Sequence, residues 1–361
     1  MSGHVNGRIT TQHPVSVSLE ELRNDRTPFS ALEEAFGPYS LGILIVRDLP
    51  PGFIQLRKTL LSYSSYLANL PQEELAKLED PDSHYLVGWS CGKETLKDGR
   101  YDTLKGSYYM NPRQTPSYKR RAQELYPDLC EYNAENVWPG HDVLPGFHQS
   151  FQSLCDLIID VAALVARACD RYAAEKIPGY QPGYLEYVVK TSVSTKARLL
   201  HYCPSTASGI DGDTTDGDED DWCATHLDHG CLTGLTSAMF VDEGAHPPIR
   251  NKTDEDLPAL PELGTPPDPK AGLYIHSRSG QVIKVSIPKD CLAFQTGEAL
   301  EVITKGEFKA VPHFVRGIAP GMGGKIARNT LAVFTQPNLW EKVDEGSDFA
   351  TFAKGIVERN H

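Results

Sequence analysis

The pattern of hydrophobic and polar positions changes along the chain. Apolar residues recur at three- and four-residue steps from Phe147 to Tyr172, which predicts a long amphipathic helix. The compact apolar run Leu41–Asp48 predicts a buried strand. Pro51 followed by Leu56–Leu67 predicts another helix, and the Gly-, Tyr- and Ser-rich stretch Gly88–Asn111 predicts an irregular loop or a hairpin.

Beyond Lys196 the helical period gives way to short strand-like runs separated by turns. This alternation is typical of a β-sandwich or jelly roll. Two long loops interrupt it, and both are expected to be mobile or to face a substrate: the acidic Ser205–Asp221 and the proline-rich Asp242–Lys270. The predicted strands are Leu199–Tyr202, Thr233–Phe240, Gly272–Ser277, Gln281–Val285, Ala293–Thr296, Lys309–Pro312 and Thr330–Phe334.

These two patterns predict a chain that is mainly β with flanking helices, organised as one integrated catalytic unit. Residues 1–195 would form an N-terminal α/β region that includes the long backing helix, and residues 196–340 the catalytic β core. Residues 341–361 would close the chain with a helix at Asp348–Glu358, for which Ser347 is a plausible N-cap.

The amino-acid composition limits the classes of function that the protein could have. The 361 residues are 40% hydrophobic, enough for a sizeable core, and carry a net charge of −13 without a basic block. We therefore expect no nucleic-acid partner, no membrane partner and no large polymeric substrate. The polar N-terminus does not resemble a signal peptide, and eight cysteines without a C-x-x-C pair indicate reduced thiols in a cytoplasmic protein. The oligomeric state is not indicated.

The sharpest local signal is the segment Thr225-His226-Leu227-Asp228-His229-Gly230. In a strand, His226 and Asp228 would share one face and could reach one metal ion, whereas His229 would point the opposite way. His313 is the best candidate for a third ligand. Two histidines and a carboxylate form the facial triad of non-haem Fe(II) oxygenases, which leaves three open positions for a 2-oxo acid and O2. His276 and His201 could also lie near this site.

A candidate anchor for the 2-oxo acid follows His313 in the sequence. Arg328 and Thr330 would share one face of a strand. A guanidinium beside a hydroxyl suits a carboxylate, because the pair offers a bidentate ion pair and one further hydrogen bond. This chemistry matches the distal carboxylate of 2-oxoglutarate.

The order His226-x-Asp228, His313, Arg328-x-Thr330 resembles the 2-oxoglutarate/Fe(II)-dependent dioxygenases, and within them the isopenicillin N synthase-like branch. The run from Gly272 to His313 is similar to that branch's characteristic strand-and-turn pattern, and the match covers roughly residues 38 to 340. The resemblance implies a double-stranded β-helix, a cupin-like jelly-roll core. It also implies Fe(II) on His226, Asp228 and His313, and 2-oxoglutarate on Arg328 and Thr330.

One departure concerns the co-substrate. Many relatives have Asn-Tyr-Tyr-Pro where this chain reads His201-Tyr202-Cys203-Pro204, so the tyrosine that often contacts 2-oxoglutarate is replaced by Cys203. That hydrogen bond is either lost or supplied by Tyr202.

The chemistry implied by the resemblance is oxidation of an unactivated C–H bond, with succinate and CO2 as co-products. The outcome would be hydroxylation, desaturation or oxidative cyclisation. We expect a small metabolite, such as an amino acid or a natural-product intermediate of secondary metabolism. The candidate substrate contacts are Arg198, Arg316, Phe240, Tyr274 and Trp222.

Three alternatives stay open on the sequence. The chain could be an oxidase or cyclase of isopenicillin N synthase type that uses no 2-oxoglutarate. It could be a non-catalytic binding protein on the same fold. It could also be a zinc hydrolase that uses the same two histidines and aspartate, although this reading gives no role to Arg328 and Thr330.

Overall fold

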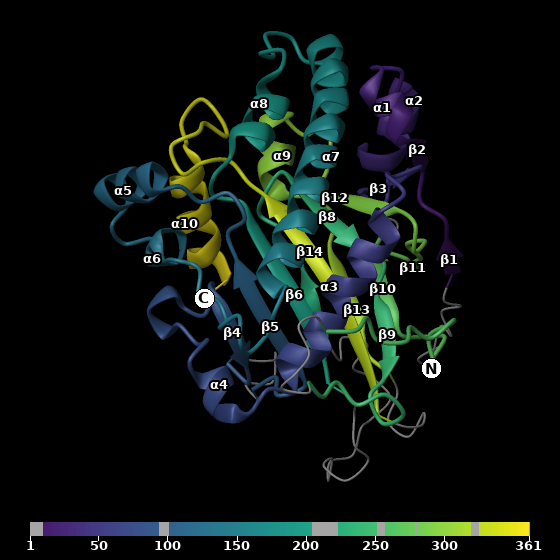
Figure 1. Ribbon diagram of the computed structural model, residues 1–361. Coiled ribbons are helices and arrows are strands. Elements are labelled where there is room, and N and C mark those ends of the chain that lie inside the picture. Colours follow the sequence, from purple (N-terminus) through teal and green to yellow (C-terminus); the bar gives the residue numbers. More distant parts are fainter. Residues whose placement is uncertain are drawn as a thin grey trace, which may run out of the picture.

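The computed structural model describes residues 10–93, 101–203, 223–250, 257–278, 280–318 and 325–360. This part of the chain mixes helices and sheets, so the helices contribute more than the predicted mainly β class suggests (Figure 1). The helices are α1 Leu19–Arg23, α2 Phe29–Phe36, α3 Phe53–Ala68, α4 Gln72–Ala76, η1 Pro81–Ser83, α5 Pro116–Leu125, α6 Cys130–Asn133, α7 Phe147–Lys176, α8 Tyr184–Thr191, α9 Glu298–Ile303 and α10 Phe349–Asn360.

The strands form two sheets with different strand orders. The larger sheet has the order β2-β3-β12-β8-β14-β6-β5-β4, with β9 also paired to β14, and the smaller has the order β1-β11-β10-β13-β7. The strands are β1 Thr10–Gln12, β2 Ser16–Ser18, β3 Ile43–Arg47, β4 Gly88–Cys91, β5 Lys105–Met110, β6 Lys196–Tyr202, β7 Cys223–His226, β8 Leu232–Thr236, β9 Met239–Asp242, β10 Gly272–His276, β11 Val282–Val285, β12 Leu292–Thr296, β13 His313–Arg316 and β14 Ile326–Thr335.

The second half of the chain passes back and forth between the two sheets. β6, β8, β12 and β14 belong to the large sheet, and β7, β10, β11 and β13 belong to the small one. The pairs within this set are antiparallel, and most of them join strands that are distant in the sequence, such as β14 with β6 and β13 with β7. Pairing of this kind brings residues that are far apart in the sequence close together, for example His226 at the end of β7 and His313 at the start of β13.

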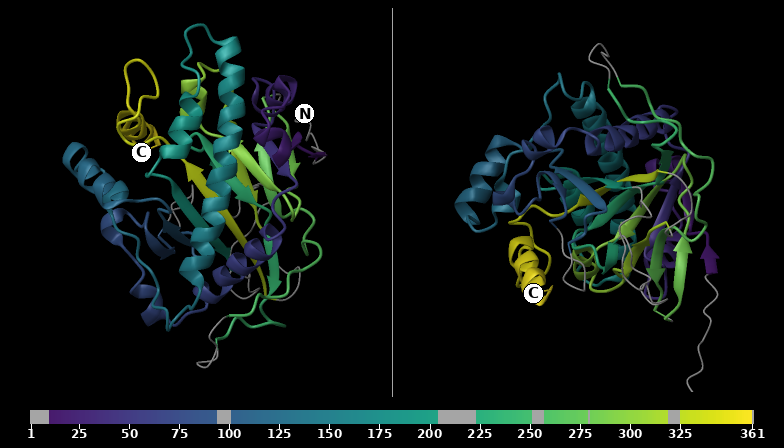
Figure 2. Two further views of the ribbon diagram at one scale, coloured as in Figure 1. Left: turned by 45° about the horizontal axis from the view of Figure 1, so that its top comes forward. Right: turned by 90° about the horizontal axis from the view of Figure 1, so that it is seen from below.

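Helices α3 and α7 cover one face of the large sheet (Figures 1 and 2). The approach of α7 is close at Gly234 of β8, where a Cβ atom would lie 2.3 Å from Cγ2 of Ile158. The predicted helix Phe147–Tyr172 is confirmed and continues to Lys176, just before Pro178 and Gly179. The main hydrophobic core fills the space between these helices and the sheet.

A smaller apolar cluster joins the two sheets to each other. Ile43 and Ile45 of β3 and Ala293 of β12 meet Ile275 of β10 and Val285 of β11. The sheets therefore pack face to face at this place, with apolar side chains from both inner surfaces.

Three sequence predictions about local structure are wrong. Lys309–Pro312 is not a strand, because its backbone groups bond elsewhere: the amide of Lys309 donates to the carbonyl of Phe36, and the carbonyl of Lys309 accepts from the hydroxyl of Thr296. The strand begins instead at His313. Helix α10 is capped by Asp348, whose carboxylate accepts from the amide of Thr351, and not by Ser347.

The third error is the single strand predicted over Thr233–Phe240. It is two strands, β8 and β9, separated at Ser237 and Ala238. The carbonyl groups of these two residues accept hydrogen bonds from the buried guanidinium of Arg57 on α3. A long-range contact from the first half of the chain therefore occupies the acceptors at the break.

Two further expectations concern the chain as a whole. The division into residues 1–195, 196–340 and 341–361 stays a prediction. Among the helices of the described ranges, none combines the length and the apolar character that crossing a membrane requires.

Candidate functional site

Three side chains with metal-binding atoms meet between β7 and β13. His226 ends β7, His313 begins β13, and the two residues face each other in the antiparallel register of these strands. Asp228 follows β7 in the next turn and is not in the strand itself. Oδ1 of Asp228 lies 3.7 Å from Nε2 of His226 and 3.8 Å from Nε2 of His313. The sequence-predicted triad is thus brought together in space.

The turn that carries Asp228 is fixed by the start of α9. The carbonyl of Asp228 accepts from the amide of Glu298 at 2.8 Å, and the amide of Gly297 donates to the carbonyl of Cys231. Gly297 lies so close to this turn that a Cβ atom would be 2.2 Å from the carbonyl oxygen of Gly230. The absence of a side chain at Gly297 therefore determines where the carboxylate of Asp228 can lie.

The histidine pair differs in exposure. The side chain of His226 is 42% exposed, whereas His313 is buried. Burial lowers the pKa of His313 to about 4, an effect opposed by the charge of Asp228 and reinforced by His226. A histidine that is neutral at ordinary pH presents a lone pair, which is the form that binds a metal ion.

The donor set and its surroundings fit an Fe(II) ion. Ligand atoms that share one ion at about 2.1 Å lie roughly 3 Å apart, so the distances here need only a small contraction. Oδ2 of Asp228 is buried and has no hydrogen-bond partner in the described part of the chain. A buried carboxylate oxygen without a partner is costly unless a cation or a ligand completes it.

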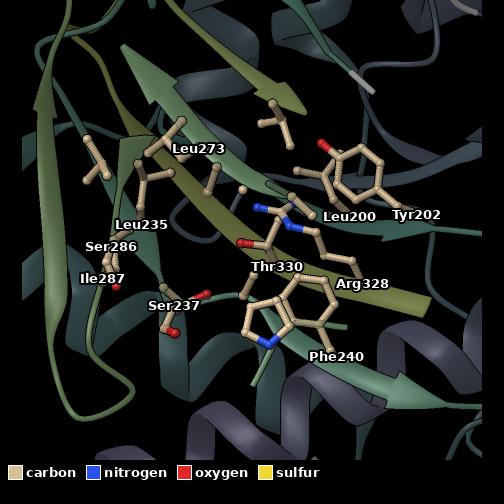
Figure 3. A pocket seen from close by; sticks show the side chains of 18 of the residues that line it. Leu200, Tyr202, Leu235, Ser237, Phe240, Leu273, Ser286, Ile287, Arg328 and Thr330 are labelled. Atoms are coloured by element: carbon tan, nitrogen blue, oxygen red, sulfur yellow. The ribbon is translucent and has the colours of Figure 1, made fainter. Parts of the chain in front are cut away.

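A cavity of about 380 Å³ extends from the triad between the two sheets. Its volume falls within the range of small-molecule pockets. Strand β14 contributes Arg328 and Thr330 to the wall, and β6 contributes Leu200 and Tyr202 (Figure 3). Apolar side chains such as Leu235 form much of the remainder.

Arg328 and Thr330 lie on one face of β14, as their two-residue spacing predicts. Both are buried, with exposed fractions of 5% and 8%, and both point into the cavity (Figure 3). The guanidinium carbon of Arg328 lies 5.0 Å from the ring centroid of Tyr202, which the register places opposite Arg328 on β6. The three residues that the sequence suggested for a co-substrate therefore line one cavity together, whereas Cys203 does not line it.

Of the four candidate substrate residues within the described ranges, two line the cavity and two do not. Arg198 and Phe240 line the cavity, and the guanidinium of Arg198 donates to Oγ of Ser107. Tyr274 does not line it: the ring is fully buried against Phe314 and the hydroxyl donates to the carbonyl of Lys270. Arg316, at the end of β13, does not line it either. Trp222 and the Ser205–Asp221 loop lie outside the described residues.

Three histidines that the sequence placed near the triad, His229, His276 and His201, have partners outside it. His229 lies 2.8 Å from a carboxylate oxygen of Glu298, in line with its expected exclusion from the ligand set. His276 lies 3.2 Å from the hydroxyl of Thr225. His201 is buried on the opposite face of β6 from the cavity, with Nδ1 2.8 Å from Oδ1 of Asn329.

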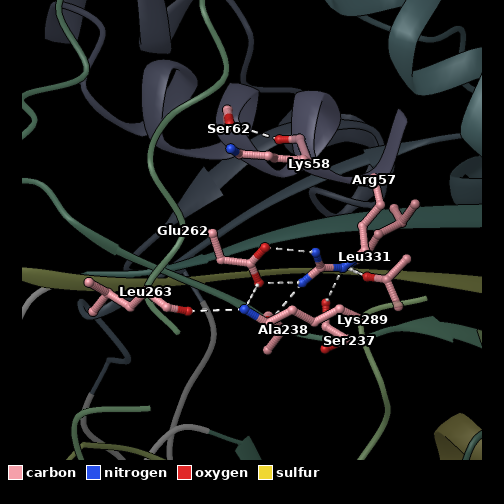
Figure 4. A network of polar contacts seen from close by, with 10 residues as sticks. Arg57, Lys58, Ser62, Ser237, Ala238, Glu262, Leu263, Lys289 and Leu331 are labelled. Atoms are coloured by element: carbon pink, nitrogen blue, oxygen red, sulfur yellow. Dashed lines mark hydrogen bonds and ion pairs between the residues drawn. The ribbon is translucent and has the colours of Figure 1, made fainter. Parts of the chain in front are cut away.

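Three charged residues that line the cavity were not found from the sequence. They are Glu262 in the proline-rich segment after β9, Lys284 of β11, and Lys289. The carboxylate of Glu262 accepts two hydrogen bonds from the fully buried guanidinium of Arg57 and lies 3.2 Å from Nζ of Lys289 (Figure 4). The segment predicted as a substrate-facing insertion is thus tied to α3 and forms a wall of the cavity.

One more group of metal-binding side chains exists among the described residues. His84, Cys130 and Glu131 bring their ligand atoms within 4.8 Å of one another, outside the cavity. Of these two groups, the one formed by His226, Asp228 and His313 combines metal-binding atoms with a cavity. The second group matters for metal titrations, because it could bind an added ion.

Proteins with a similar fold were found among solved structures, but not by the comparisons of sequence. No protein-family model matches the chain, and no curated protein sequence does. Among solved structures, a Caulobacter crescentus protein described as a member of the 2OG-Fe(II) oxygenase family is 19% identical; 99% of this chain and 100% of that chain are covered, with a TM-score of 0.66. A full-length Neurospora crassa protein in complex with alpha-KG and thymine is 17% identical, with 99% of each chain covered and a TM-score of 0.63.

A third solved structure extends the comparison to plants. The dioxygenase for auxin oxidation from rice is 13% identical, with 98% of this chain and 96% of that chain covered and a TM-score of 0.58. At these identities the similarity is one of fold, and it extends over nearly the whole chain. The roles of the site residues rest on their own geometry.

Substitution of Gly297 by alanine should impair metal binding without touching a ligand. The new methyl group would meet the carbonyl of Gly230 at 2.2 Å and displace the turn that holds Asp228. We expect weaker Fe(II) affinity and a loss of stability of roughly 1–3 kcal/mol from overpacking. Anaerobic Fe(II) titration and urea unfolding measure the two effects. Gly264→Ala is a matched control, because its Cβ would meet no atom within 4 Å. Unchanged iron affinity in Gly297→Ala would contradict the expectation.

Proposed function

We propose that this protein is a non-haem Fe(II)- and 2-oxoglutarate-dependent oxygenase that oxidises an unactivated C–H bond of a small molecule. The observation that carries the proposal is the convergence of His226, Asp228 and His313 on a cavity that also contains Arg328 and Thr330. A metal triad alone fits several reactions. A buried guanidinium and hydroxyl in the same cavity supply the site for a carboxylate that the co-substrate requires.

The strand topology supports the finer fold assignment. Eight strands, β6 to β8 and β10 to β14, are divided between the two facing sheets, and β9 is an addition to the large sheet. This arrangement corresponds to a double-stranded β-helix, or jelly roll. The similar solved structures include proteins described as 2OG-Fe(II) oxygenases, which supports the same assignment. Placement in the isopenicillin N synthase-like branch rests on the sequence pattern and is part of the proposal.

In this proposal the protein mainly binds and orients. His226, Asp228 and His313 would hold Fe(II) from one side and leave the other side open. Bound Fe(II), 2-oxoglutarate and O2 together would supply the oxidising power for the C–H bond, with succinate and CO2 as co-products. The guanidinium of Arg328 and the hydroxyl of Thr330 would bind the distal carboxylate. Apolar walls such as Leu235 and Phe240 would limit access of water.

A small molecule is the substrate class that best fits the cavity. Its volume of about 380 Å³ suits a metabolite such as an amino acid or a natural-product intermediate. The similar Neurospora crassa protein is crystallised with thymine and with 5-formyluracil, small ligands of comparable class. Arg198, held by Ser107 and lying over the ring of Tyr109, would orient a negatively charged group of the substrate, and Phe240 would pack against it.

The deciding experiment measures succinate. For a substrate found by screening, we expect one succinate per oxidised product, and no product without 2-oxoglutarate. Arg328→Met should raise the KM for 2-oxoglutarate roughly 10- to 100-fold, because a charge-assisted pair contributes about 1.5–3 kcal/mol. Full product yield without 2-oxoglutarate would favour the oxidase alternative. Hydrolysis supported by zinc alone would favour the hydrolase.

A further inference from the structure

Three metal-binding side chains that the proposed reaction does not use meet beside helix α6. Cys130 and Glu131 begin α6, and His84 directly follows the short helix η1. Sγ of Cys130 lies 3.9 Å from Nδ1 of His84 and 3.7 Å from Oε2 of Glu131, and the three ligand atoms all lie within 4.8 Å of one another. Helix α6 lies well away from β13, so this group is separate from the triad (Figure 1).

The distances within this group are close to those that a shared metal ion imposes. In a tetrahedral zinc site, with Zn–S of about 2.3 Å and Zn–N or Zn–O of about 2.1 Å, a sulfur atom lies roughly 3.6 Å from each neighbouring ligand atom. The two distances from Sγ of Cys130 exceed this value by only a few tenths of an ångström. His84 is exposed and Cys130 and Glu131 are half-buried, so small rotations of these side chains can close the site around an ion.

The backbone that carries the three ligands is held in place from the interior. The buried Nζ of Lys196 donates to the carbonyl of Leu86 at 3.0 Å and to the carbonyl of Glu131 at 2.6 Å. One ammonium group thus fastens the loop that contains His84 to the start of α6. The ligands from these two segments are therefore presented together before any ion binds.

The charges around Cys130 favour a bound cation over a nucleophilic thiolate. Burial and the negative charge of Glu131 raise the pKa of the Cys130 thiol, so the cysteine is not activated for nucleophilic attack. A divalent cation that replaces the thiol proton would meet one thiolate and one carboxylate, which together balance its charge. The positive charge of Lys196 is offset by Asp80 and Glu131, which raise the pKa of Lys196 against the larger effect of burial.

We propose that His84, Cys130 and Glu131 form a zinc site that is separate from the proposed iron centre and does not depend on the proposed function. Imidazole nitrogen, thiolate sulfur and carboxylate oxygen are all zinc ligands, and a thiolate favours zinc over Fe(II). On binding, the thiol of Cys130 gives its proton to solvent and Zn²⁺ takes its place, with no change of oxidation state. Three protein ligands leave one tetrahedral position for water. The bound ion cross-links the loop of His84 to α6 and thereby stabilises the folded state.

Cobalt(II) is a probe that distinguishes the two metal sites, because a thiolate-to-cobalt charge-transfer absorption requires a sulfur ligand and the triad has none. The metal-free, reduced full chain is titrated with Co²⁺ without oxygen, and Zn²⁺ is then added. We expect the absorption band to appear with Co²⁺ and to disappear as Zn²⁺ displaces it. In Cys130→Ser the band should be absent. In His84→Ala the Kd of Co²⁺, read from the same band, should rise at least about 10-fold, because loss even of a group that only supports a metal ligand costs about that much.

Cys91→Ser is the matched control for the cysteine variant. Cys91 is likewise a half-buried free cysteine, and it belongs to neither group of metal-binding side chains in the described ranges, so its replacement should leave the band and the Kd of Co²⁺ unchanged. Absence of the band in the wild type would overturn the inference. So would a band that persists in Cys130→Ser, or a Kd of Co²⁺ that His84→Ala leaves unchanged.

Discussion

Replacement of Asp228 by alanine is expected to abolish both iron binding at the cavity and turnover. The carboxylate is the only negatively charged member of the triad, and it lies between the two imidazoles at 3.7 and 3.8 Å. Its removal leaves two neutral ligands for a dication and an enlarged buried space. We expect iron affinity to fall beyond detection in an anaerobic micromolar titration and activity to fall by at least about 10³-fold, in keeping with the loss of about 4 kcal/mol or more.

The controls use two neighbouring features. His229→Ala removes the adjacent histidine, which contacts Glu298 and not the triad, so iron binding should persist. Cys130→Ser removes a ligand atom from the second group of metal-binding side chains, so the stoichiometry at the cavity should remain one ion per chain. Retention of a full equivalent of cavity-bound iron by Asp228→Ala would show that the triad is not the metal site.

The triad was accessible from the sequence because its signal is local. His226 and Asp228 are two residues apart, and the period of a strand places such residues on one side of the chain. The structure refines this picture: β7 ends at His226, and Asp228 reaches the same point from the following turn, held by Gly297 and Glu298. The pair Arg328 and Thr330 was accessible for the same reason, because both lie within β14.

Residues that act through distant contacts were missed or misplaced. Lys284 lies in a predicted strand, but the position of its side chain beside Gly272 depends on the pairing of β10 with β11, which a single sequence does not reveal. Tyr274 was predicted near the substrate, yet its ring stacks on Phe314 of β13. In both cases the alternation along the strand was readable, whereas the identity of the neighbouring strand was not.

Arg57 is the clearest example of such a contact. On α3 it has the appearance of a surface residue in sequence, but its side chain is completely buried. It donates to the carbonyls of Ser237 and Ala238 and forms a bidentate pair with Glu262 (Figure 4). One side chain thus links a helix of the first half, the turn between two strands and a wall of the cavity.

Replacement of Arg57 by methionine should therefore destabilise the protein by about 3 kcal/mol, the lower end of the cost of breaking a buried ion pair. The lower end applies because Lys289 still contacts the carboxylate of Glu262 in the variant. Urea unfolding at pH 7 measures the change. Lys58→Met is the matched control on the same helix, because Lys58 is only half-buried, and its effect should stay within about 0.5 kcal/mol.

The pH dependence of the free energy of unfolding distinguishes the contribution of the Arg57–Glu262 ion pair from that of packing. Burial raises the pKa of Glu262, but the hydrogen bonds and charges of Arg57 and Lys289 outweigh it and lower the pKa below the usual 4.5. A carboxyl whose pKa is lower in the folded state stabilises that state fully above pH 4.5, and this contribution is lost as the pH falls through the folded-state pKa. The stability difference between the wild type and Arg57→Met should therefore shrink between pH 5 and pH 3. A difference that stays constant over this range would show that Arg57 stabilises the cavity wall by packing and carbonyl hydrogen bonds alone, without a contribution from the charge of Glu262.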